Sequence, residues 1–144
     1  MHSATRATES APSGALTLHS SKRKLWAGRL ISAIVILFLV FDAIGKLLKV
    51  PPVLEAFARL GYSANLAIGI AVLLLVCTAI YAVPRTSIFG AVLLTAYLGG
   101  AVAANVRVND PLFETLFPAL FGVLMWSGIF LRDDRLLKLF PLRS

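Results

Sequence analysis

Four long apolar runs, separated by short polar segments, dominate the pattern of this chain. The runs cover residues 25–48, 64–83, 86–104 and 112–131. A helix that crosses a bilayer needs about 20 predominantly apolar residues, and each run is close to that length. The pattern therefore predicts an all-α membrane protein, a bundle of four transmembrane helices forming one domain over residues 25–131.

A shorter amphipathic stretch separates the first two runs. Pro51-Pro52 ends the first run, because proline lacks an amide donor and restricts the residue before it. Residues 53–60 then combine an apolar face with Glu55 and Arg59, which lie one helical turn apart. This spacing predicts a short helix in the outer membrane interface, with Glu55 and Arg59 as a solvated surface pair of little energetic weight.

The two chain ends lack this pattern. Residues 1–24 are rich in Ser, Thr and Ala, show no apolar period and finish in the basic triplet Lys22-Arg-Lys24. Such a composition predicts a disordered basic N-terminal tail. Residues 132–144 mix basic residues with leucines before Pro141, which predicts a short interfacial C-terminal segment.

Composition and charge agree with a membrane solvent. Hydrophobic residues make up 58% of the chain and charged residues only 15%, against about 25% in a typical soluble domain. The net charge of +7 comes from basic residues at the ends of the runs, which indicates topology and anionic lipid rather than nucleic acid. With both termini in the cytoplasm, ten basic residues fall inside and four outside, so this orientation is expected. The four outer ones are Lys46, Lys49, Arg59 and Arg107.

The residue inventory narrows the possible chemistry. Cys77 is the single cysteine, which excludes a disulfide framework and a cysteine-based metal site within one chain. The two histidines, His2 and His19, lie in the polar tail, so no intramembrane histidine is available for haem or zinc. We therefore expect no metal site and identify no catalytic residues.

Polar residues near the outer ends of three runs form a candidate binding site. They are Asp42, Lys46, Asn105, Arg107 and Glu114. Ionisable groups inside a span are costly and often functional. One hypothesis is a polar pocket under the short helix, holding a small anion between Lys46 and Arg107. The alternative is that Asp42 and Lys46, four residues apart, form a structural ion pair and the others are solvated in loops.

Two further patterns predict local structure. Small residues spaced four apart favour close approach of a partner helix, and we expect packing at Ala96, Gly99, Gly100, Ala103 and Ala104. Asp110 is positioned to cap the last helix, with Pro111 as its first residue.

Several short motifs resemble the DoxX-like family, and together they cover about residues 25–142. They are Phe41-Asp-Ala-Ile-Gly-Lys46, Arg59-Leu-Gly-Tyr62, Tyr97-Leu-Gly-Gly-Ala-Val102 with Asn105 and Arg107, Phe117-Pro118 with Gly122 and Trp126, and Leu131-Arg-Asp-Asp-Arg-Leu136. The resemblance implies a small four-helix protein of the bacterial inner membrane.

The resemblance also implies a link to redox work, since a relative in this family is a subunit of a thiosulfate:quinone oxidoreductase. It supplies no catalytic residues, and this chain has no thiol pair. The expected function is an auxiliary, non-catalytic subunit beside a membrane or peripheral redox enzyme, with quinone as a ligand by family analogy. The alternatives are a small carrier of an apolar or weakly acidic metabolite and a purely structural assembly protein.

Overall fold

The computed structural model of the protein describes residues 13–133 and residue 136. In this part of the chain all regular structure is helical, in five helices. They are α1 (Ser13–Leu47), α2 (Pro51–Arg59), α3 (Leu66–Ala82), α4 (Ser87–Arg107) and α5 (Leu112–Arg132). The predictions for residues 1–12 and for nearly all of the C-terminal segment fall outside the described residues.

The first helix begins earlier than its apolar run. We predicted a start at residue 25, whereas α1 begins at Ser13, so residues 13–24 are helical rather than disordered. Adding a residue to an existing helix gains a hydrogen bond without the cost of a new nucleus, so a packed span can carry a polar extension. The other boundaries lie within three residues of the predicted ones.

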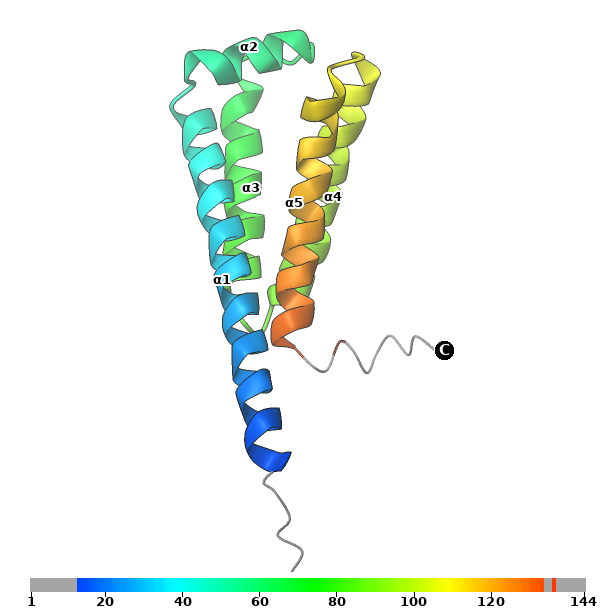
Figure 1. Cartoon of the computed structure of the whole chain (residues 1–144). Coiled ribbons are helices and arrows are strands. Elements are labelled where there is room, and N and C mark those ends of the chain that lie inside the picture. The colour runs from blue at the N-terminus through cyan, green and yellow to red at the C-terminus, as the bar shows by residue number, and fades with distance from the viewer. Residues whose placement is uncertain (1–12, 134–135, 137–144) are drawn as a thin grey trace, which may run out of the picture.

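The four long helices form an antiparallel bundle in which each packs against two neighbours, in the cyclic order α1, α3, α4, α5. Figure 1 shows the α1–α3 pair and the α4–α5 pair diverging toward one end, where α2 lies across the ends of α1 and α3. We call this the α2 end, and the opposite end, which contains the α3–α4 turn, the narrow end. The start of the apolar part of α1 and the end of α5 both lie toward the narrow end.

Glycines bring backbones together at the narrow end. A Cβ added to Gly90 would lie 2.3 Å from the backbone nitrogen of Tyr81, so α4 meets the end of α3 at van der Waals contact. Gly28 and Gly128 make a similar approach between α1 and α5, where a Cβ on Gly28 would lie 2.9 Å from the Gly128 carbonyl oxygen. Only a residue without a side chain permits this spacing.

The predicted small-residue packing on α4 was mostly wrong for contacts within this chain. Ala96, Gly99, Gly100 and Ala103 are exposed, and only Ala104 is buried. A Cβ added to Gly99 or Gly100 would meet no neighbouring atom within 4 Å. The spacing did indicate a small-residue surface, but spacing alone does not identify what faces it.

The outer surface of the bundle is apolar. Trp26, Phe41 and Phe113 are each 74% exposed, and large exposed aliphatic side chains cover the flanks of α1, α3, α4 and α5. Within the described residues, three helices are long and apolar enough to cross a membrane: the Ser21–Leu47 part of α1, then α4 and α5. An apolar surface of this extent indicates a lipid environment.

Candidate functional site

A cavity of about 600 Å³ lies between the diverging helix pairs at the α2 end. All five helices contribute to its wall, with α2 forming the cover. Most of the lining is apolar, and its deeper part includes an aromatic cluster of Phe38, Phe117 and Phe121. The rings of Phe38 and Phe121 stack with their centroids 4.1 Å apart, and Phe117 lies 5.1 Å from Phe121. The size is that of a small-molecule site.

The two charged residues of the cavity wall form an ion pair. The Lys46 ammonium group donates to the Asp42 carboxylate one helical turn earlier on α1. The Lys46 side chain is only 13% exposed and Asp42 is 33% exposed. Pairing offsets part of the cost of holding each charge away from bulk water. The predicted structural pair is therefore present, and it is also part of the cavity lining.

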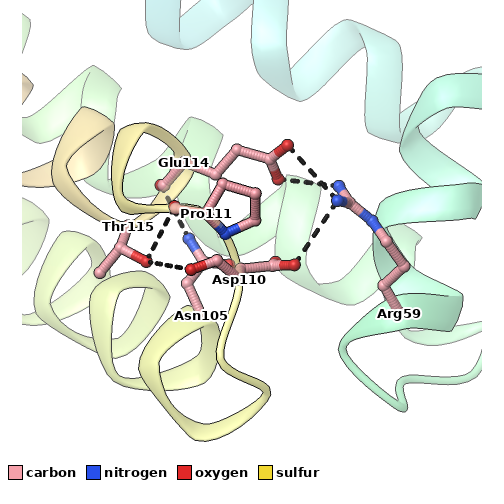
Figure 2. Close-up of polar contacts among 6 residues, drawn as sticks. All are labelled: Arg59, Asn105, Asp110, Pro111, Glu114 and Thr115. Atoms are coloured by element: carbon pink, nitrogen blue, oxygen red, sulfur yellow. Dashed lines mark hydrogen bonds and ion pairs between the residues drawn. The ribbon is translucent and has the colours of Figure 1, made fainter.

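A second set of charges fastens α2 to the turn between α4 and α5 (Figure 2). The Arg59 guanidinium donates to Glu114 Oε2 at 2.8 Å and to Asp110 Oδ1 at 3.5 Å. The hydrogen bond with Glu114 raises the pKa of Arg59, with a further contribution from Asp110. The interpretation of Glu55 and Arg59 as a solvated pair was wrong, because Arg59 binds across to another part of the fold. Asp110 does not cap α5 with its side chain, because Pro111 occupies the N-cap position rather than the first helical position.

Arg107 makes another link to α2. Its Nη2 donates to the carbonyl oxygen of Leu60 at 2.6 Å, just beyond the last residue of α2. Lys49 and Gly61, on either side of α2, both have positive φ values, which lets the chain turn sharply into and out of this helix. Arg107 does not line the cavity. It holds the cover in place rather than facing the space beneath it.

Asn105 donates a hydrogen bond to a backbone carbonyl oxygen that Pro118 leaves without its helical donor. A proline at position 118 has no amide proton, so the carbonyl oxygen of residue 114, one turn earlier in α5, loses its helical donor. Asn105 Nδ2 donates to that Glu114 carbonyl oxygen at 2.9 Å (Figure 2). The amide of Asn105 thus replaces the hydrogen bond that Pro118 removes, and both residues line the cavity.

A model of the DoxX-like family matches residues 30–128, which is more than two thirds of the chain. The chain belongs to the DoxX-like family. No curated protein and no solved structure matches it. Family membership and the apolar helices together support a membrane protein, and the matched residues contain the whole cavity wall.

The five candidate residues of this family member divide into two groups. Asp42, Lys46 and Asn105 line the cavity, whereas Arg107 and Glu114 lie outside it and hold α2 in position. The predicted anion site between Lys46 and Arg107 is not formed as such, because Lys46 is paired with Asp42 and Arg107 with Leu60.

Sequence reasoning missed Arg59 as part of the site and gave Tyr97 no definite role. Arg59 has Glu55 one turn earlier, and that local spacing hid its contacts 51 and 55 residues away. Tyr97 lines the cavity and is half-buried. Its position on α4, eight residues before Asn105, places it about 12 Å deeper at 1.5 Å per residue.

Proposed function

We propose that this DoxX-like protein spans a bacterial inner membrane four times, with both termini in the cytoplasm. The helix α3 has 17 residues, about 26 Å at 1.5 Å per residue, and lacks charged side chains. That length is at the lower limit for a span, and a shortfall of a few ångströms costs only fractions of a kcal/mol per ångström. The distribution of basic residues favours the cytoplasmic side for the narrow end.

Cysteine labelling tests this topology. In a Cys77→Ala background, S10C and S144C are expected to react with a membrane-impermeant maleimide only from the cytoplasmic side. S63C and N109C, in turns at the α2 end, are expected to react only from the opposite side. Labelling of S10C and S144C from opposite sides would contradict an even number of spans.

We further propose that the protein is an auxiliary, non-catalytic subunit of a membrane redox system, and that it holds a hydrophobic ligand beneath α2. The cavity carries this proposal: it is about 600 Å³, has an aromatic wall, and its charged groups belong to one ion pair near the cover. The resemblance within the family supports the redox link and a quinone as ligand. Fold membership alone does not establish either.

Ligand binding tests the cavity directly. The full chain in a mild detergent is incubated with a benzoquinone carrying a decyl tail, and occupancy is measured by native mass spectrometry. Ala101 lines the cavity, so A101W is expected to abolish binding by filling the space. Ala103 is exposed on the same helix outside the cavity, and A103W serves as the matched control that retains binding. Equal occupancy in both variants would place the ligand elsewhere.

Co-isolation tests the redox link. Purification from native membranes in mild detergent is expected to recover the chain with a flavoprotein or dehydrogenase. The competing candidate is a carrier of an apolar or weakly acidic metabolite, favoured by the mostly apolar cavity lining. A protein that purifies alone and moves such a solute into vesicles would support the carrier. If no partner is recovered and no solute moves, an assembly role would be favoured.

A further inference from the structure

The cavity has no unbalanced charge with which to attract an ion. Asp42 and Lys46 are the charged members of its lining, and they neutralise each other in one ion pair. Arg107, which the sequence placed beside the ligand, is outside the lining and donates to the Leu60 carbonyl oxygen. Binding a net charge would require breaking the pair or leaving the new charge without a partner, and both are costly in an apolar cavity.

Tyr97 supplies a hydrogen-bond donor deeper in this cavity. It is half-buried, and its hydroxyl makes no hydrogen bond to any described residue. Tyr81, the corresponding buried tyrosine of α3, bonds to Ser32 and to the Met125 carbonyl oxygen. Polar groups inside a fold are normally paired. The Tyr97 hydroxyl is therefore available to a ligand atom that accepts a hydrogen bond.

Flat aromatic surfaces form another wall of the same cavity. Phe38 and Phe121 stack at an interplanar angle of 21°, and Phe117 meets Phe38 edge-on with centroids 5.5 Å apart. All three side chains and Tyr97 line the cavity. Aromatic walls favour a ring that can stack offset or contact them by its edge.

We propose that the cavity selects an uncharged ligand with a flat apolar ring and a carbonyl oxygen, and that Tyr97 donates the hydrogen bond that positions this oxygen. Asp42 and Lys46 then exclude charged competitors, because each already satisfies the other. This inference rests on the proposed function, since it takes the cavity as a ligand site, and it specifies the chemical class of the ligand.

Three probes of matched shape test this selectivity in the full-length protein. They are para-decylacetophenone, which has a ring and a carbonyl oxygen, decylbenzene, which has no acceptor, and para-decylbenzoate, which is an anion. Occupancy is measured by native mass spectrometry at one detergent concentration, so partition into micelles is the same for every variant. We expect the ketone to bind most tightly and the benzoate most weakly.

Y97F removes only the hydroxyl and is expected to weaken ketone binding about two- to tenfold, the range for one neutral hydrogen bond. Its affinity for decylbenzene should stay unchanged. Tyr81 is outside the cavity lining, and its hydroxyl bonds to Ser32 and to the Met125 carbonyl oxygen, so Y81F is the matched control and should bind the ketone like the wild type.

The outcomes separate this inference from the proposed function. If none of the probes, including the decyl benzoquinone, binds the wild type, the cavity is not a ligand site and both proposals fail. If the benzoate binds as tightly as the ketone, or Y97F weakens decylbenzene as much as the ketone, only the inference is overturned. Should Y97F unfold, the wild-type preference still decides, because equal affinity for ketone and hydrocarbon would contradict a positioned donor.

Discussion

The two ends of the bundle use similar residues in opposite ways. At the narrow end, Gly90 touches the backbone of Tyr81, and the Tyr81 hydroxyl lies 3.1 Å from Ser32 Oγ. At the α2 end, Gly100 borders open space and the Tyr97 hydroxyl has no partner among the described residues. Close packing therefore holds the helices together at the narrow end. The α2 end is held by polar links that reach around a cavity.

This difference indicates how one small bundle can be both stable and hollow. Membrane helices associate largely through close packing, so glycine contacts are an effective place to concentrate stability. A cavity loses such contacts, and the surrounding helices must be positioned by other means. Here the helices around the cavity are positioned by hydrogen bonds from Arg59, Asn105 and Arg107.

Adding one methyl group at the narrow end should have the largest effect. In G90A the new Cβ would lie 2.3 Å from the Tyr81 nitrogen and 2.4 Å from its Cα, so the α3–α4 contact must open. Overpacking typically costs about 1–3 kcal/mol, and we expect the upper part of this range because backbone cannot rotate away. The free energy of unfolding is measured by SDS titration of the detergent-solubilised protein, followed by circular dichroism.

G99A is the matched control on the same helix. Its Cβ meets nothing within 4 Å, and alanine is favoured over glycine in a helix by up to about 1 kcal/mol. G99A should therefore leave the free energy of unfolding unchanged or raise it. A loss of stability in G99A equal to that in G90A would mean that the two ends are packed alike.

The pair of Asn105 and Pro118 should have the next largest effect. N105A leaves the part-buried Glu114 carbonyl oxygen without its donor, and we expect a loss toward the lower end of the range of about 1–3 kcal/mol for an unsatisfied buried acceptor. P118A restores the amide proton that the helix itself would use. The loss caused by N105A should therefore be smaller in the P118A background than in the wild type. Additive losses in this double-mutant cycle would contradict the replacement of one donor by the other.

The same substitution, tyrosine to phenylalanine, at Tyr81 and at Tyr97 tests the difference between the two ends. Y81F removes a hydroxyl bonded to Ser32 and Met125 and should lower the free energy of unfolding by about 0.5–1.5 kcal/mol. Y97F removes a hydroxyl without a protein partner and should leave this free energy unchanged. Thermal unfolding of both variants without added ligand provides the measurement. A larger loss in Y97F would show that its hydroxyl already has a structural role.

Periodicity predicted the helical elements well because it reports local structure. The apolar runs and Pro51-Pro52 placed the helices within a few residues, apart from the start of α1. The pairing of Asp42 with Lys46 was also predictable, since four residues in one helix bring two side chains together.

Contacts between distant segments were not predictable from spacing. Arg59 had a local partner in Glu55 but binds Asp110 in the α4–α5 turn and Glu114 in the first turn of α5. Asn105 was recognised as polar and near the cavity, but its structural partner required knowing that Pro118 lies beside it. In retrospect, a proline inside a helix signals an unpaired carbonyl, and a nearby amide is the residue to look for.

The smallest effect on stability is expected from the link between α2 and the α4–α5 turn. Arg59 is 48% exposed, so its ion pairs contribute little to the free energy of unfolding. An arginine is charged at neutral pH, and the hydrogen bond with Glu114 raises the pKa of Arg59 further, so the link is not lost by deprotonation near neutral pH. R59Q should therefore leave the unfolding midpoint unchanged but loosen α2 over the cavity.

Loosening is measured by the reaction of a water-soluble maleimide with A56C in the Cys77→Ala background, because Ala56 lines the cavity from α2. R59Q should raise the labelling rate several-fold, and high salt should do the same to the parent by screening the exposed charges. E55Q changes a charge on the same helix that makes no ion pair with any residue that the structure describes, and it should label like the parent. If E55Q accelerated labelling as much as R59Q, general charge on α2 would control access. If the contact of Arg59 with Glu114 and Asp110 controls access, R59Q must raise the labelling rate and E55Q must not.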